Sequence, residues 1–186
     1  VEKAFAIGSN IYEQNRDKKS QIEIKKMILD ALRPLLWNHG ESFIFILDKE
    51  GNFVLAPSYL RDLEGKNIIN FKDATGRFVI QEEIQTVKER GEGFLWDTFT
   101  RPQKDPSIQY KQIAFVKDFG MFEWYFGSAE YLDTTTQEIE KAVLEILRNI
   151  NKNSEGYFFI FDTEGKVILH SSNPELEGKN LLQSND

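Results

Sequence analysis

The chain has 186 residues, of which 40% are hydrophobic and 28% are charged. This composition supports a packed core, and the length allows one ordinary domain plus part of another, so a disordered segment is excluded. The formal net charge of −7 argues against nucleic-acid binding, which requires a basic surface. The absence of cysteine excludes disulfide bonds, thiolate chemistry and a cysteine-based zinc site.

Helical patterns open the chain. Residues 1–14 carry apolar side chains at helical spacing, and residues 15–19 form a polar break. The helical pattern resumes over residues 20–37, behind an S-x-x-E capping box made by Ser20 and Glu23. We expect these segments to supply the long N-terminal helix of the domain.

Two short strand patterns follow. Residues 43–47 and 52–56 flank the sequence Asp-Lys-Glu-Gly, which predicts a β-hairpin whose turn uses a positive φ at Gly51. Residues 57–76 then form a loop that is longer than a simple connection requires. Such loops are usually functional or disordered.

The remaining patterns complete a sheet. Residues 78–90 predict a second helix, and residues 94–100, 110–117 and 122–132 predict three strands. The segment 101–109 contains two prolines and is typical of a hairpin loop. The order predicts an α+β fold in which the N-terminal helix packs on a five-stranded antiparallel sheet, with the long loop and second helix covering it.

Part of this pattern occurs twice. Residues 20–67 and 135–180 share a capping box, six apolar positions at helical spacing, a D-x-x-G turn and the motif Leu-Glu-Gly-Lys-Asn. The second capping box consists of Thr135 and Glu138. We therefore divide the chain into a complete module, 1–133, and a segment, 134–186, that holds a connecting helix and the first half of a second copy.

The longest unbroken apolar runs contain five residues, for example 43–47. They predict neither a transmembrane helix nor a signal peptide. The chain starts within a helical pattern and stops within a repeat. We therefore expect both ends to be boundaries inside a longer protein, which leaves room for membrane spans outside this segment.

Several motifs occur in a characteristic order. They are Gly156-Tyr157-Phe158-Phe159-Ile160-Phe161-Asp162, Leu176-Glu177-Gly178-Lys179-Asn180, Gly91-Glu92-Gly93-Phe94, Arg101-Pro102, Phe115-Val116-Lys117 and the run from Trp124 to Asp133. This order resembles the Cache family of extracytoplasmic sensor domains, and the partial second copy makes the chain similar to a double Cache sensor. The chain departs from the family pattern at Ser128-Ala129-Glu130-Tyr131, at Phe115 and at Ala56-Pro57.

The resemblance implies a PAS-like fold and a signalling role. Such domains sit outside the inner membrane between two transmembrane helices, and the first module is the membrane-distal one. They bind small metabolites and pass the signal to a histidine kinase, a methyl-accepting chemotaxis domain or a cyclic-dinucleotide enzyme. For this chain the resemblance implies a periplasmic segment of a membrane-anchored receptor.

A ligand pocket in such a fold lies between one face of the sheet and the covering loop and helix. A small carboxylate, the leading ligand class, requires a cation or converging donors, because an unpaired buried carboxylate is costly. Candidate donors and wall residues for this site are Arg77, Arg101, Lys117, Ser128, Thr98, Tyr59, Trp96, Phe99 and Phe115. Each of them also has a structural interpretation as an ion-pair partner, a solvated strand end or a packed side chain.

The sequence offers little evidence for catalysis or metal binding. His39 is typical of a turn, and His170 could line a pocket only if the second copy were completed; no spacing between the two histidines predicts a metal site. The acidic pair Glu82-Glu83 is typical of a solvated helix face. None of the common catalytic motifs occurs, so we expect no enzymatic role for this segment, no cofactor and no metal.

Two functions remain open. In the first, the module is a sensor that binds a small metabolite under residues 57–76 and transmits the change through strand 122–132 to the following helix. In the second, it binds nothing small and serves as a dimer spacer, with helix 1–37 as the seam. A cavity with converging polar groups would favour the sensor, whereas a filled, wholly apolar core beneath the loop would favour the spacer. The second copy must also bury its apolar faces: it could pack on the first module, pair with another chain by swapping, or stay poorly ordered.

Overall fold

The computed structural model describes residues 1–150 and 156–182. It divides into two compact units, Val1–Leu132 and Asp133–Asp186. Among the described residues, no helix has both the length and the hydropathy that a bilayer crossing requires.

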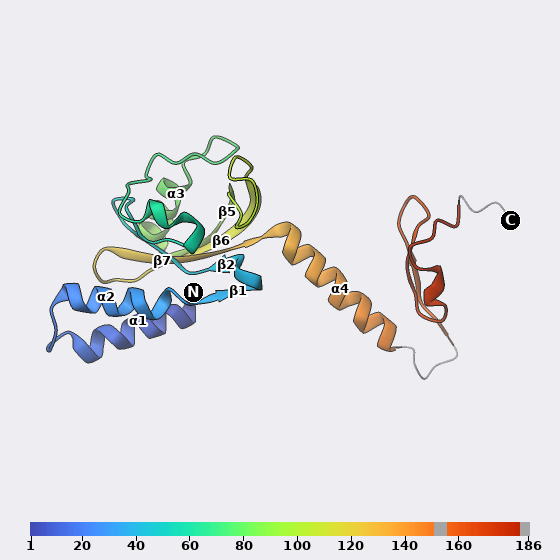
Figure 1. Cartoon of the computed structure of the whole chain (residues 1–186), viewed down its shortest axis with the longest axis horizontal. Coiled ribbons are helices and arrows are strands. Elements are labelled where there is room, and N and C mark those ends of the chain that lie inside the picture. The colour runs from blue at the N-terminus through green and yellow to red at the C-terminus, as the bar shows by residue number, and fades with distance from the viewer. Residues whose placement is uncertain (151–155, 183–186) are drawn as a thin grey trace. The chain divides into compact units, whose positions relative to one another are not determined.

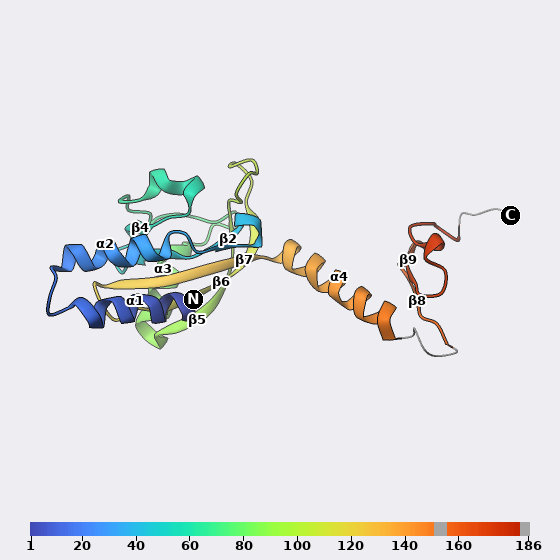
Figure 2. The same ribbon diagram turned by 60° about the horizontal axis from the view of Figure 1, so that its bottom comes forward.

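Two helices, rather than one long helix, open the first unit. α1 spans Glu2–Asn15 and α2 spans Gln21–Leu32, and they lie side by side along one face of the sheet (Figures 1 and 2). The capping box predicted at Ser20 is confirmed, because its hydroxyl accepts from the backbone N–H of Glu23 and the Glu23 carboxylate accepts from the backbone N–H of Ser20. The expectation of one long helix is therefore wrong: the polar segment before Ser20 is a connection between two helices.

The second helix also ends earlier than predicted. α2 stops at Leu32 rather than at residue 37, two residues before Pro34. Proline lacks the N–H that the next helical bond requires, and its ring clashes with the preceding turn. The chain instead forms β1, Leu36–Trp37, which pairs with β2, Ser42–Phe43, across a short turn containing His39.

The predicted five-stranded antiparallel sheet is confirmed. Its strands are β3 (Phe45–Asp48), β4 (Phe53–Leu55), β5 (Glu92–Phe99), β6 (Tyr110–Asp118) and β7 (Trp124–Tyr131). The spatial order is β4-β3-β7-β6-β5, so β7 lies at the centre and pairs with both β3 and β6. The chain thus belongs to the α+β class, and β5 forms a free edge of the sheet.

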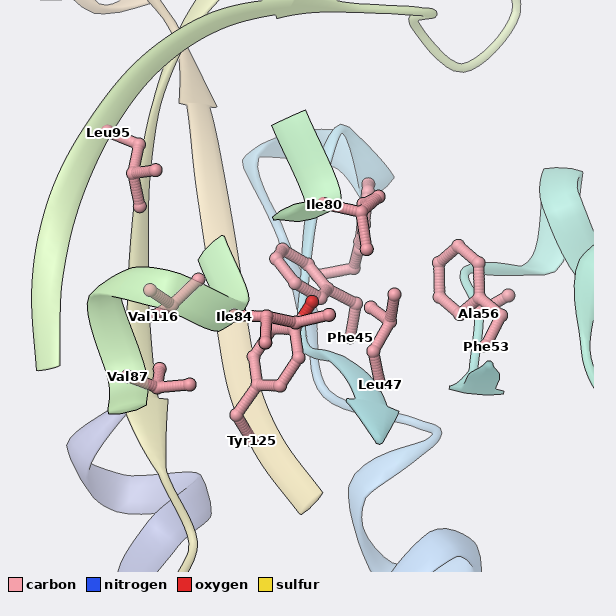
Figure 3. Packing of buried hydrophobic residues seen from close by; sticks show 11 residues of the cluster. Phe45, Leu47, Phe53, Ala56, Ile80, Ile84, Val87, Leu95, Val116 and Tyr125 are labelled. Atoms are coloured by element: carbon pink, nitrogen blue, oxygen red, sulfur yellow. The ribbon is translucent and has the colours of Figure 1, made fainter. Parts of the chain in front are cut away.

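Each face of the sheet has its own core. α1 and α2 cover one face, where Ile28, Phe119 and Phe126 are buried. α3 (Val79–Arg90) and the segment that contains the short 3-10 helix Ser58–Leu63 cover the other, where Ile84, Val116 and Tyr125 pack (Figure 3). We call these the α1–α2 face and the α3 face. Neighbouring residues of β7, Tyr125 and Phe126, point to opposite faces because strand side chains alternate.

The second unit contains α4 (Leu132–Ile150), the hairpin of β8 (Phe159–Phe161) and β9 (Val167–His170), and a short 3-10 helix, Pro174–Leu176. The side chains of the predicted capping box, Thr135 and Glu138, lie outside the described residues.

Both hairpin turns have the same hydrogen bonds, so the two copies share the geometry of this turn. In the first copy, Asp48 Oδ1 accepts from the N–H groups two and four residues later, and Gly51 has a φ of 88°. In the second copy, Asp162 Oδ1 accepts from the corresponding N–H groups, and Gly165 has a φ of 85°. Positive φ values of this kind favour glycine, which explains why both copies keep it.

Candidate functional site

A small cavity lies within the core of the α3 face. Its volume is about 30 Å³, roughly the space that one water molecule needs. It is lined by Phe43, Phe45, Leu47, Phe53, Leu60, Ile68, Val79, Ile80, Glu83, Phe99, Gln112 and Ala129. The lining is therefore apolar except for one carboxyl group and one amide, and a metabolite could enter only if α3 or the segment 57–76 moved.

Glu83 places a carboxyl group inside this apolar core. It is only 3% exposed, and its Oε2 accepts a hydrogen bond of 2.8 Å from the hydroxyl of Tyr125. Burial raises the pKa of Glu83 to about 8, although the bond from Tyr125 opposes the rise. The expectation that Glu82 and Glu83 both lie on a solvated helix face is wrong for Glu83, which shares the inner stripe of α3 with Ile80, Ile84 and Val87.

A second carboxyl group, Asp97, is buried on the same face. It is 6% exposed, and its Oδ1 accepts a hydrogen bond of 2.7 Å from Nε2 of Gln112, its partner on β6. Burial raises the pKa of Asp97 to about 6; the hydrogen bond from Gln112 lowers it, and the negative charge of Asp73 raises it further. The α3 face thus carries two buried carboxyl groups, on α3 and on β5.

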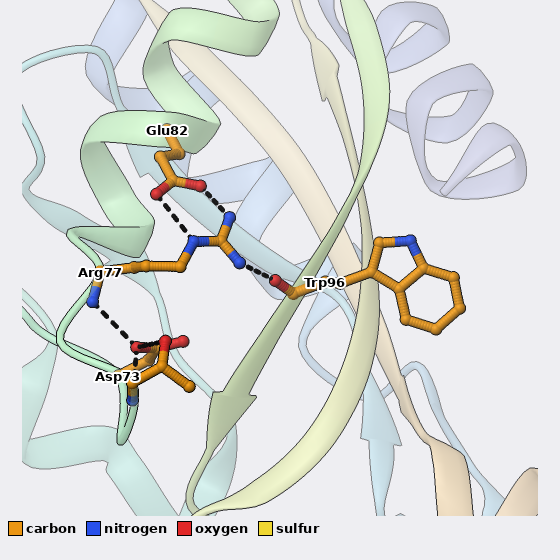
Figure 4. A network of polar contacts seen from close by, with 5 residues as sticks. Asp73, Arg77, Glu82 and Trp96 are labelled. Carbon is orange, nitrogen blue, oxygen red and sulfur yellow. Dashed lines mark hydrogen bonds and ion pairs between the residues drawn. The ribbon is translucent and has the colours of Figure 1, made fainter.

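A polar network fixes the segment before α3 to the edge strand β5 (Figure 4). Asp73 Oδ1 accepts from the N–H and the hydroxyl of Thr75, at 2.9 and 2.6 Å, and from the N–H of Arg77 at 3.0 Å. The guanidinium of Arg77 pairs with the Glu82 carboxylate and donates to the backbone carbonyl of Trp96. The Trp96 indole points away from these groups (Figure 4). The network connects the covering segment, the first turn of α3 and β5.

Four predicted site residues face away from the cavity. The expectation that they point towards the loop 57–76 is wrong for Phe115, Lys117 and Ser128, which lie on the α1–α2 face, and for Trp96, whose indole is 58% exposed. Strand alternation defines two sets of side chains but not which set is buried. On β5 the buried set is Leu95 with Asp97 rather than Phe94 with Trp96.

These residues have structural partners on that face. The ammonium of Lys117 pairs with Glu2 at 3.0 Å and Glu92 at 2.5 Å, and it lies over the ring of Phe5. Phe115 packs against Phe94, and Ser128 is its register partner on β7. Their role in ligand binding stays a prediction.

Two further candidates, Arg101 and Tyr59, lie near the ends of β5 and β7. The guanidinium of Arg101 forms a bidentate pair with Glu41, at 3.0 and 2.6 Å, and lies over the ring of Tyr131. The hydroxyl of Tyr59 donates to the carbonyl of Thr100 at 2.9 Å.

The last two, Thr98 and Arg77, adjoin the network around Asp73. The Thr98 hydroxyl accepts from the N–H of Ala74 and donates to Gln109. Eight of the nine predicted site residues do not line the 30 Å³ cavity. Of the wall residues that the sequence suggested, Phe99 does.

Sequence reasoning missed the polar residues of the α3 face. Glu83 and Asp97 were overlooked because charged residues are usually solvated. A signal was available, since Glu83 follows Ile80 and precedes Val87 at helical spacing, and Asp97 shares the alternation of Leu95 and Phe99. On β6, Gln112 has the same parity as the buried residues Ala114 and Val116. On β7, Tyr125 has the same parity as the buried residue Ala129.

Comparisons with known proteins agree with this architecture. A periplasmic sensor domain of a chemotaxis protein has 24% identity to this chain and a TM-score of 0.62, covering 70% of this chain and 87% of its own. A Cache chemosensory domain solved to explain carboxylic acid recognition has 20% identity and a TM-score of 0.60, covering 70% of this chain and 92% of its own.

A methyl-accepting chemotaxis protein from Vibrio parahaemolyticus has 20% identity and a TM-score of 0.59, covering 72% of this chain and 87% of its own. At these identities the structural likeness concerns the fold. The family model described as Cache domain matches residues 1–186, the whole length of the sequence. The chain therefore belongs to the Cache domain family of sensor modules.

Proposed function

We propose that this chain is the extracytoplasmic, ligand-binding part of a transmembrane receptor, either a sensor histidine kinase or a methyl-accepting chemotaxis protein. A small metabolite binds to the first unit between the α3 face of the sheet and its cover, α3 with the segment 57–76. The family membership supports a sensor, and the solved neighbours include chemotaxis sensor domains.

One observation carries this proposal: two carboxyl groups are buried where a ligand would bind. Glu83 and Asp97 lie in the core between α3 and the sheet, 3% and 6% exposed. Burying an ionisable group costs stability, and a module that served only as a spacer would be more stable with apolar residues there. Buried groups with shifted pKa values are typical of functional sites.

A carboxylic acid is the first ligand class to test, because one of the neighbours recognises carboxylic acids. Among the predicted donors, Arg101 and Arg77 both have a guanidinium arranged around a carboxylate; that of Arg101 pairs with Glu41 and is the more buried of the two, with its side chain 11% exposed. A carboxylate ligand would replace Glu41 in this bidentate pair. Substitution of Arg101 by Gln would then abolish the response to carboxylic acids.

The signal has a direct route along the chain. β7 is the central strand of the sheet, and α4 begins at the residue that follows it. Ligand binding stabilises one position of α3 and the covering segment, and β7 carries the change to α4. Such a shift requires the ligand to bind one conformation more tightly than the other.

A thermal-shift screen of residues 1–186 against carboxylic acids, amino acids, amines and purines tests the proposal. A specific ligand raises the melting temperature, since binding to the folded state stabilises it by mass action. Absence of a shift at millimolar concentrations for every class would contradict the sensor function.

The spacer function has one observation in its favour, the small volume of the cavity, about 30 Å³. If no class binds, this function becomes the better one. Its seam would consist of α1 and α2, because no continuous helix spans 1–37. Sedimentation of the chain would then show a dimer that substitution of the exposed Ile22 on α2 by Asp disrupts.

A further inference from the structure

A second pocket lies beside the cavity, at the edge of the sheet. Its volume is about 170 Å³, and its lining includes Asp73, Asp97, Thr98, Lys111 and Gln112. Gln112 lines both the cavity and this pocket. The pocket is formed by the segment before α3 and by the strands β5 and β6. It is large enough for a short alkyl chain with a polar head.

Two of the residues that line this pocket each have a buried carboxylate oxygen without a donor. Asp73 and Asp97 are 5% and 6% exposed, and within the described part of the chain no group donates a hydrogen bond to Oδ2 of either residue. The Oδ1 atoms, by contrast, are satisfied by Thr75, Arg77 and Gln112. Buried acceptors without donors are rare in folded proteins and require an explanation.

The neighbouring cations do not supply the missing donors. Arg77 directs its guanidinium at Glu82 and at the Trp96 carbonyl (Figure 4). Lys111 lines the pocket, but its side chain is exposed and donates to neither Oδ2 atom. The hydrogen bonds from Thr75 and Arg77 outweigh the effect of burial and hold the pKa of Asp73 below its ordinary value, so this carboxylate is negative at neutral pH.

The chemistry of the two oxygens selects the ligand. Both are acceptors, so the bound group must be a donor, and a positive charge on it would add to that of Arg77, which also lines the pocket, in balancing ionised Asp73. Among the described residues no group of three His, Cys, Asp or Glu side chains could hold a metal ion, so the two acids offer fewer protein ligands than an all-protein calcium site uses. A primary ammonium group has three N–H donors and a charge of one, and it can contact both carboxylates at once.

We propose that Asp73 and Asp97 bind the primary ammonium group of a small organic amine. The inference rests on the proposed sensor function and names the cationic end of its ligand. The ammonium lies between the two Oδ2 atoms, and its alkyl chain extends along the pocket. Because the pocket joins the segment before α3 to β5, an amine bound there links the covering segment to the sheet.

Calorimetric titration of residues 1–186 at pH 7.5 with three ligands of the same carbon skeleton tests the inference. Propylammonium carries a cation, 1-propanol is neutral and propionate is an anion. We expect propylammonium to bind in this pocket, and neither 1-propanol nor propionate to bind there. The variants D73N and D97N keep Oδ1 for their existing hydrogen bonds and replace Oδ2 by a donor, so both should fold and weaken propylammonium binding by at least about tenfold.

The variant D118N is the matched control, since it removes one negative charge at a carboxylate that pairs with Lys49, outside the pocket. It should leave propylammonium affinity unchanged. If propylammonium binds D73N and D97N as tightly as the unmodified chain, the site is elsewhere and the inference is overturned. If propylammonium fails to bind while propionate or another metabolite does, the inference is also overturned, but the sensor function stands. If no ligand of any class binds, both fall.

Discussion

Replacement of Glu83 by Gln should stabilise the first unit, and the gain should grow with pH. Burial raises the pKa of Glu83 from 4.5 to about 8. A carboxyl group whose pKa is higher in the folded state holds its proton more tightly there, so stability is greatest below about pH 4.5 and falls as pH rises towards 8. At pH 7 this difference costs about 3 kcal/mol, since each pKa unit corresponds to roughly 1.4 kcal/mol.

Glutamine is neutral at every pH and keeps an oxygen that can accept the bond from the Tyr125 hydroxyl. We therefore expect E83Q to match the unmodified chain within about 1 kcal/mol at pH 5 and to exceed it by about 3 kcal/mol at pH 7. For a chain of this size the gain at pH 7 corresponds to a rise in melting temperature of about 5–10 °C.

Urea unfolding followed by tryptophan fluorescence measures this effect in the structural unit that contains Glu83. The three tryptophans, Trp37, Trp96 and Trp124, all lie within Val1–Leu132, so their signal reports that unit. E89Q is the matched control, because Glu89 is an exposed residue of the same helix; it should keep the pH dependence of the unmodified chain. If E83Q keeps that dependence too, or is less stable at pH 8, the carboxyl group does not carry the assigned cost.

Three other substitutions have definite expected results. G127A should destabilise the first unit by about 2 kcal/mol or more, measured by urea unfolding, since a Cβ there would lie 2.1 Å from the buried ring of Phe45. S20A should cost about 1 kcal/mol in the same assay through loss of the α2 cap. K117A should leave the affinity for any ligand identified in the screen within about twofold, because its ammonium pairs with Glu2 and Glu92 on the α1–α2 face. A larger loss of affinity would indicate that Lys117 belongs to the ligand site.

The hydrophobic periodicity of the sequence was sufficient to predict most of the fold. The capping box at Ser20, the turn at Gly51 and the three long strands could be predicted because each depends on neighbours in sequence. The early end of α2 could also have been predicted from Pro34, which lies inside the expected helix and cannot continue its hydrogen bonding.

The site was harder to predict, because strand alternation defines two sets of side chains but does not say which set is buried. On β5, one set contains Phe94 and Trp96, and the other contains Leu95 and Asp97. Aromatic residues favoured the first set as the pocket wall, but β5 is an edge strand, and the structure leaves Phe94 and Trp96 exposed. The register of β5 on β6 decides the matter, and it depends on contacts between segments that sequence periodicity does not contain.

The residues that broke the rule of solvated charges are the ones on which the proposed function depends. Asp97 shares the alternation of Leu95 and Phe99, but alternation alone does not decide which set of side chains is buried. Its burial becomes meaningful only beside Asp73, which reaches the same pocket from a different segment. Natural sequences are locally consistent except where a site requires otherwise, so two acids that share a buried pocket indicate a ligand more strongly than either acid alone. A cation that satisfied both would recover part of the cost of burying them, and that recovered free energy is what could hold α3 and its covering segment in a single position.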